Sequence, residues 1–291
     1  MWNQTNRLMI FSKFWRNKMQ RTDLQHANTT KFLISSLIIS AFILVIANLF
    51  NQENYAFLEY WYPTDILFII IPGIVVVLSI RLAIMHGGTG AHGKAWMFFS
   101  AFIIFWFAAE QLFDYYVDYD LNDWKTYIAD VLWISGYPLF FGFALFYLKI
   151  VKKAISRKII ITSCLISTSL LIPSLYFSLE DSSDLELIEV AIALAYPIWD
   201  TIILCPTVIG IIIFLKGKVN FLWTLILFAI VCNVAGDTFY TITLYDDSYY
   251  PGHPLDILFI WAYVFFAFGV YSHIRLFSSK DKKQTIGNNE H

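Results

Sequence analysis

Three acidic residues lie inside apolar stretches of this 291-residue chain, where a carboxyl group is costly to bury. They are Glu110, Asp200 and Asp237. Asp200 follows Glu189, the start of its apolar stretch, by eleven residues, which on a helix places it roughly 16 Å into a hydrocarbon layer about 30 Å thick. Carboxyl groups at such depth bind protons, cations or polar ligand groups, act as acid and base, or hold helices together.

Polar residues accompany these acids at helical spacing. Trp106, Glu110 and Asp114 are four residues apart, and Asn233 precedes Asp237 by four, so each set lies on one helix face. If these faces meet Asp200, they line a polar cavity that opens outward, and Pro197 bends the helix beside it. An inert network of hydrogen bonds between helices remains the alternative. The predicted ligand-binding residues are Asp200, Asp237, Glu110, Asn233, Trp199, Tyr196 and Tyr240.

Other chemistries are disfavoured by the residues present. The three cysteines form no CxxC pair and there is no His-x-x-x-His pair, so we expect neither a metal site nor a cofactor. Gly88 to Lys94 has the spacing of a phosphate loop, but Ala95 replaces the serine or threonine that would hold magnesium. We interpret this stretch as a turn, and the net charge of -2 suggests no nucleic-acid partner.

Composition indicates which elements position these residues. The chain is 58% hydrophobic and only 14% charged, whereas soluble domains carry about 25% charge. We predict an all-α integral membrane protein in which each of eight apolar segments crosses the lipid bilayer as a helix. The segments are 32–50, 64–85, 95–116, 128–150, 158–178, 187–215, 220–243 and 255–277.

The distribution of charge predicts the orientation. Alternate loops are basic, and of the 20 lysines and arginines only Lys125 falls on the opposite side. By the positive-inside rule, we expect a multi-pass protein of the cell membrane with both termini in the cytoplasm. The basic and aromatic tail 1–31 has the composition of an interfacial helix, residues 32–277 form the transmembrane domain, and 278–291 form a polar cytoplasmic tail.

An internal repeat relates the even-numbered segments. Each begins with an acid, followed seven residues later by a tyrosine or proline, and segments 3–4 align with 7–8 at an offset of 126 residues. This pattern predicts four parallel helical hairpins. We expect the leading acids to cap their helices, whereas Asp200 does not repeat, because Phe141 and Ala267 occupy its equivalent positions. The acid–aromatic or acid–proline pairs are Asp65 and Pro72, Asp130 and Tyr137, Glu189 and Tyr196, and Asp256 and Tyr263.

Four short stretches resemble a known family. Residues 129–138, 195–200, 236–240 and 252–256 are similar to the multi-helix membrane module found ahead of diguanylate cyclase and histidine kinase domains in prokaryotes. The resemblance covers about residues 95–277 and implies a sensory input role. Because only a short polar tail follows the eighth segment, we expect signalling through a separate cytoplasmic protein.

Two functions therefore remain open. The favoured hypothesis is a stand-alone sensory or ligand-binding module, without enzymatic activity, that recognises a lipid or a small polar ligand at Asp200. The alternative is a lipid-modifying hydrolase that uses Asp200, Asp237 and Glu110 as acid and base, because the chain also resembles eight-helix lysoplasmalogenase-type enzymes. A solute transporter is less favoured, because parallel repeats lack the inverted halves common in that class.

Overall fold

The computed structural model describes residues 63–118, 126–180, 186–214, 221–246, 248–249 and 253–288, together with single positions between 35 and 46. The chain divides into two units, Met1–Leu44 and Val45–His291. The predicted interfacial tail 1–31 lies outside the described residues. Of the predicted first span, 32–50, only those single positions are described, and they are helical.

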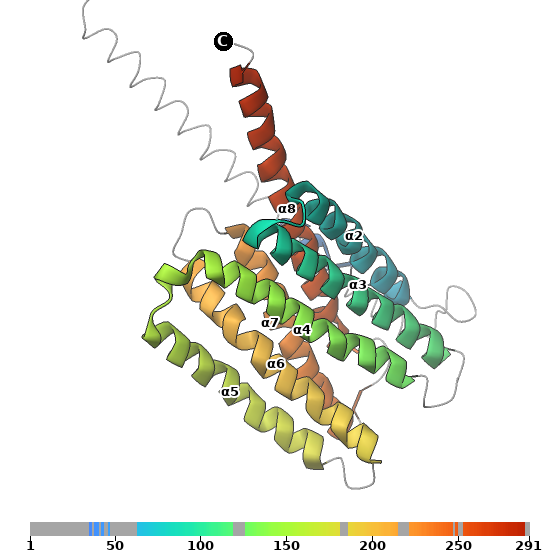
Figure 1. Ribbon diagram of the computed structural model, residues 1–291. Coiled ribbons are helices and arrows are strands. Elements are labelled where there is room, and N and C mark those ends of the chain that lie inside the picture. The colour runs from blue at the N-terminus through green and yellow to red at the C-terminus, as the bar shows by residue number, and fades with distance from the viewer. Residues whose placement is uncertain are drawn as a thin grey trace, which may run out of the picture. The chain divides into compact units, whose positions relative to one another are not determined.

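The second unit is all-helical over its described residues, which contain no strand. Seven of its helices are long and apolar enough to cross a membrane, as expected for a multi-pass membrane protein, and they confirm the last seven predicted segments. A short 3₁₀ turn, Lys152–Ala154, follows α4. The helices, shown in Figure 1, are α2 Pro63–His86, α3 Gly90–Asp118, α4 Thr126–Ile150, α5 Arg157–Glu180, α6 Leu187–Phe214, α7 Phe221–Tyr245 and α8 Asp256–Asn288.

Two helix ends differ from the prediction. Helix α3 begins at Gly90, so most of the glycine-rich stretch is helical and the turn is confined to Gly87–Thr89. Gly87 and Gly90 have φ angles of 58° and 71°, a conformation that glycine adopts without steric cost. Helix α8 continues to Asn288, through a polar stretch, 276–288, that contains no proline to interrupt it.

The packing of the second unit is a closed ring of six helices. The principal contacts join α2 to α3, α3 to α4, α4 to α6, α6 to α7, α7 to α8 and α8 back to α2. Helix α5 lies outside this ring against α6 and α7, at the edge of the bundle in Figure 1. Consecutive helices α3/α4, α5/α6 and α7/α8 make the most extensive contacts, as predicted for helical hairpins.

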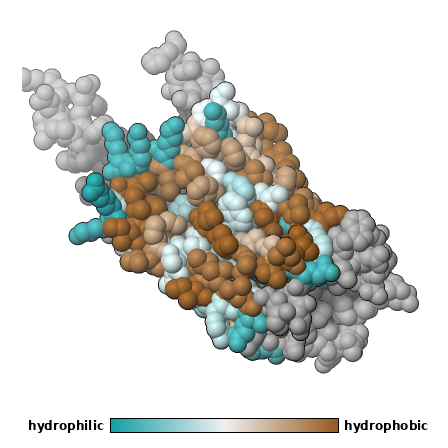
Figure 2. Space-filling model, turned by 60° about the horizontal axis from the view of Figure 1, so that its bottom comes forward, coloured by the Kyte–Doolittle hydropathy of each residue, from teal (hydrophilic) through white to brown (hydrophobic). Residues whose placement is uncertain are grey.

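The two ends of this bundle differ in charge. We call the end at which α2, α4, α6 and α8 begin the acidic end, since Asp65, Glu189 and Asp256 lie in first turns there. The opposite end, which carries Lys94 and Lys149 near helix ends, is the basic end. The exposed surface between the ends is apolar, as the brown band of Figure 2 shows, because isoleucine and leucine side chains such as those of α5 point outward.

The leading acids do not all cap helices. The Glu189 Oε2 atom accepts a hydrogen bond from the Glu186 backbone N–H at 2.9 Å, which confirms the predicted capping role at α6. The same prediction is wrong for Asp130, because α4 begins at Thr126. Asp130 is the fifth residue of α4 and therefore lies beyond the free N–H groups of the first turn.

A layer of phenylalanines separates the two ends inside the ring. On α3, α4 and α8 these side chains lie between the polar residues of the acidic end and those of the basic end. Their rings pack edge to face, with centroids 5.2 Å apart for Phe102 and Phe140 and 5.5 Å for Phe99 and Phe266. Five of these phenylalanines are no more than 1% exposed: Phe99, Phe102, Phe140, Phe143 and Phe266.

Candidate functional site

The carboxyl groups of Asp200 on α6 and Asp237 on α7 are neighbours inside the bundle. Asp200 is 5% exposed, whereas Asp237 is half-buried. Among the described residues, the Asp200 Oδ1 atom is fully buried and makes no hydrogen bond, although the Tyr137 hydroxyl and the Asp237 carboxyl are its polar neighbours. A buried polar atom without a hydrogen bond is destabilising and therefore uncommon in native structures, which makes Asp200 the unusual member of this site.

Asp237 is held by two donors from different helices. The Tyr137 hydroxyl on α4 donates to its Oδ2 atom at 3.2 Å, and the Asn233 amide, one turn earlier on α7, donates to the same oxygen at 2.8 Å. Tyr137 is 1% exposed and Asn233 is 7% exposed. These bonds orient the Asp237 carboxyl, and Tyr137 also lies within interaction distance of Asp200.

Glu110 on α3 joins the site through the last helix. Its Oε1 atom accepts a hydrogen bond of 3.0 Å from the Tyr263 hydroxyl on α8, and Glu110 also interacts with the Trp133 side chain on α4. The Trp106 indole, on the same face of α3, instead donates to the backbone carbonyl of Trp133 at 3.1 Å. Glu110 is half-buried and close enough to Asp237 for their charges to interact.

These contacts link the two similar hairpins, α3/α4 and α7/α8, in both directions. Tyr137 of α4 reaches the acid on α7, and Tyr263 of α8 reaches the acid on α3. The two tyrosines are equivalent at the 126-residue offset, and Asp237 corresponds to Gln111, the neighbour of Glu110. Each hairpin therefore supplies a tyrosine donor to a carboxyl group of the other.

A third tyrosine of the repeat makes the same kind of contact. The Tyr196 hydroxyl on α6 donates to the Asp130 Oδ1 atom on α4 at 2.6 Å. Asp130 is thus a member of the interhelical network instead of a helix cap. The seven-residue interval between acid and tyrosine is the sequence signal that marks Tyr137, Tyr196 and Tyr263 together.

The remaining predicted residues lie at the margins of the site. The Trp199 ring is stacked near Tyr137, with centroids 6.2 Å apart. Tyr240 packs edge to face against Tyr249, with centroids 4.7 Å apart, near the acidic end. The side chain of Asp114 lies outside the described residues.

The charge around the carboxyl cluster is one-sided. Helices α6 and α7 contain no lysine or arginine, and the cationic residues of α3 and α4 lie towards the basic end. Neighbouring carboxylates repel each other strongly where water is scarce. A positive group that binds between them relieves this repulsion, and the smallest such group is a proton.

A second polar cluster lies at the basic end. The rings of His86 and His92 stack with centroids 6.0 Å apart, and buried His273 contacts Trp96 and Trp223. The His273 Nδ1 atom and the Gly269 carbonyl oxygen are 2.9 Å apart. Among the described residues, no three histidine, cysteine or acidic side chains are grouped so that they could hold a metal ion.

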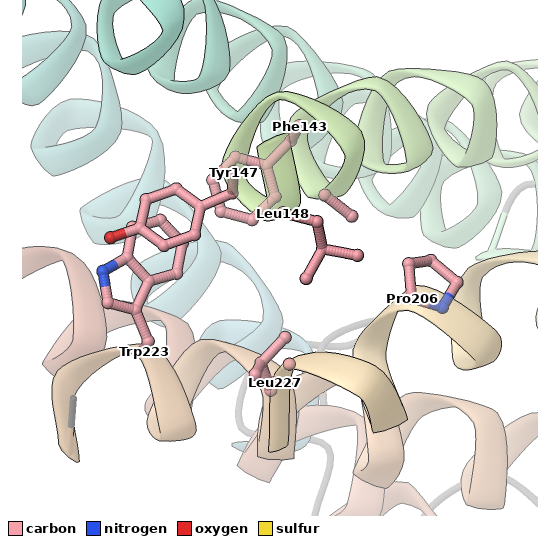
Figure 3. A pocket seen from close by; sticks show the side chains of 8 residues that line it. Phe143, Tyr147, Leu148, Pro206, Trp223 and Leu227 are labelled. Carbon is pink, nitrogen blue, oxygen red and sulfur yellow. The ribbon is translucent and has the colours of Figure 1, made fainter. Parts of the chain in front are cut away.

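A pocket between α4, α6 and α7 adjoins this cluster (Figure 3). Its lining is apolar and aromatic, and Figure 3 shows Tyr147 lying over Trp223 at one side, with Pro206 at the other. The polar site predicted from the sequence is therefore separate from this pocket. The lining residues are Phe143, Ala144, Tyr147, Leu148, Pro206, Gly210, Trp223 and Leu227.

The structure thus adds three residues to those predicted for the carboxyl cluster. Tyr137, Tyr263 and Asp130 were visible only as parts of a repeat, because a sequence does not show which helices are neighbours.

Comparison with protein-family models, curated proteins and solved structures gives no match to this chain.

Proposed function

We propose that this protein is a membrane sensory or ligand-binding module. Its ligand is a cationic group, the smallest of which is a proton, bound at Asp200 and Asp237. The observation that carries this proposal is the buried Asp200 Oδ1 atom without a donor, beside a second carboxyl group. A positive group with an N–H or O–H donor would satisfy the orphaned oxygen and relieve the repulsion between the two carboxylates.

The network around the site provides a route for signalling. The tyrosine–acid bonds link α4 to α7, α8 to α3 and α6 to α4. A ligand that changes the charge of Asp237 changes the strength of the hydrogen bond that Tyr137 donates to it. It thereby changes the contact between the α3/α4 and α7/α8 hairpins. With the termini in the cytoplasm, such a shift would be transmitted to a separate signalling protein.

The interior packing favours binding over transport. A solute that crossed the ring from the acidic end would have to pass the buried phenylalanine layer, whose rings are in mutual contact. The histidine cluster lies beyond that layer, where the His273 Nδ1 atom is 2.9 Å from the Gly269 carbonyl oxygen of its own helix. The proposal therefore places the ligand site at the acidic end only.

The test compares wild-type protein with Asp200→Asn in lipid nanodiscs. We would acidify the buffer in one series and add methylammonium at constant pH in another, and follow the unfolding temperature and the infrared carboxyl bands. We expect both probes to shift the wild type and to shift Asp200→Asn markedly less, because Asp237 and Glu110 alone then respond, while Glu189→Gln, on the same helix but outside the cluster, retains the wild-type response. An equal response in Asp200→Asn and wild type would refute the proposal.

One observation favours a second candidate, the lipid-modifying hydrolase. Asp200 and Asp237 come from different helices, yet their carboxyl groups are adjacent, as an acid and a base acting on one lipid headgroup must be. The test incubates the purified protein with 1-alkenyl lysophospholipid and measures the fatty aldehyde released. Release that is abolished in both Asp200→Asn and Asp237→Asn would establish this activity; no release above a protein-free control would remove it.

A further inference from the structure

Two cysteines from different helices are in direct sulfur contact. The Sγ atoms of Cys164 on α5 and Cys205 on α6 are 3.5 Å apart. Both thiols are free. The third cysteine, Cys232 on α7, makes no sulfur contact among the described residues. We propose that Cys164 and Cys205 form a reversible disulfide that is made by a lipid-soluble quinone.

The helix packing brings the two sulfur atoms together. On the inner side of α5, the buried residues Ser163 and Ser167 are 0% and 1% exposed, and such small side chains allow two helices to approach closely. Cys164 lies between this face and the outward-facing Leu165, which is 67% exposed. It therefore sits at the edge of the interface between α5 and α6.

The required movement is small. A disulfide joins its sulfur atoms at about 2.0 Å, so the Sγ atoms must close by roughly 1.5 Å from their contact distance. Rotation about the Cα–Cβ bonds moves a sulfur atom over such distances. The bond would fix α5, which lies outside the six-helix ring, to the helix that carries Asp200.

The depth of the pair selects the oxidant. Cys164 follows the start of α5 at Arg157 by seven residues, and Cys205 precedes the end of α6 at Phe214 by nine, which places both roughly 10 to 14 Å from the basic end. At that depth the surroundings are apolar, and Cys164 is exposed on the surface of the bundle. A quinone dissolved in the bilayer reaches this surface, whereas a charged oxidant does not.

The reaction balances without leaving a charge in the apolar layer. The two S–H bonds break and one S–S bond forms, and the two electrons released reduce the quinone. The two protons are taken up by its carbonyl oxygens, which gives a quinol. Reduction of the disulfide by a dithiol reverses the step.

The test counts thiols in the full chain held in nanodiscs under anoxic conditions. A fully substituted benzoquinone is the probe, because it has no free ring position for thiol addition. We expect the free thiols of wild-type protein to fall from three to one, and one quinol to form per chain. The Cys232→Ser variant should lose both of its thiols, while Cys164→Ser and Cys205→Ser should each keep both.

Peptide mass spectrometry then identifies the bond. A crosslinked pair of peptides containing Cys164 and Cys205, lighter by two hydrogens, is the expected product. Three thiols remaining in wild-type protein would overturn the proposal. So would covalent dimers that persist in Cys205→Ser, because they would show that exposed Cys164 pairs between chains.

Discussion

The hydroxyl group of Tyr137 on α4 donates to the Asp237 carboxylate on α7, 100 residues further along the chain, at 3.2 Å. The bond joins two hairpins at the point where Asp200 approaches from α6. It also makes Asp237 the fixed member of the carboxyl pair, whereas Asp200 retains an oxygen without a donor.

Tyr137→Phe removes this donor and leaves the ring in place. We expect the free energy of unfolding to fall by about 0.6 kcal/mol, the average for interhelical hydrogen bonds in a membrane protein, and by no more than about 1.7 kcal/mol, their maximum. Equilibrium unfolding in bicelles measures the change. Tyr271→Phe, at a position that is 49% exposed, should leave stability unaltered; an equal loss in both variants would contradict the assignment.

The two aspartates should differ in their effect on stability. Asp237→Leu leaves the Tyr137 hydroxyl and the Asn233 amide without their acceptor, at about 1–3 kcal/mol for each unpaired group. Asp200→Leu instead removes a buried oxygen that has no donor. We therefore expect Asp237→Leu to unfold more easily than Asp200→Leu by at least about 1 kcal/mol. The reverse order in the same unfolding assay would show that Asp200 is the anchoring residue.

The approach of α3 to α4 depends on a glycine. A Cβ atom at Gly136 would clash with the indole ring of Trp106, whose N–H donates to the Trp133 carbonyl. We expect Gly136→Ala to displace Trp106 and destabilise the protein by about 1–3 kcal/mol, as overpacked cores do.

Gly73→Ala on α2 is the matched control for that variant. Its Cβ atom would meet only Phe107, at 4.0 Å, and alanine favours a helix over glycine by about 0.5–1 kcal/mol. Unfolding should therefore show no loss of stability at position 73. A comparable loss at both positions would indicate that the clash with Trp106 is not the cause of the loss at position 136.

The contact between Tyr196 and Asp130 is suited to a double-mutant cycle. Tyr196→Phe and Asp130→Ala remove the two partners of the 2.6 Å bond, and we expect a coupling energy of about 0.5–1.7 kcal/mol. In the control cycle, Tyr196→Phe is combined with Glu189→Gln, whose carboxylate binds Tyr127 instead. That pair should be additive within about 0.5 kcal/mol, and additivity in the Asp130 cycle would count against the contact.

The sequence by itself determined the elements of this fold. A helix that crosses lipid must be long and apolar, and its backbone hydrogen bonds must be made within the helix. For this reason the last seven predicted segments match α2 to α8 within a few residues, apart from the start of α3 and the end of α8. The hairpin repeat followed from the positions of the acids and tyrosines. A spacing that recurs along the chain can be recognised without knowing which helices are neighbours. Asp200 stood out for the same reason, as an acid in the middle of an apolar run.

Only the tertiary structure decided which helices meet. The ring order that passes from α4 to α6 and leaves α5 outside depends on the shapes of whole helix faces, which a one-dimensional pattern does not contain. For that reason Asp130 was predicted as a cap and proved to be the acceptor of Tyr196. The pairing of Asp200 with Asp237 and the contact of Cys164 with Cys205 likewise arise from packing between segments that the sequence keeps far apart.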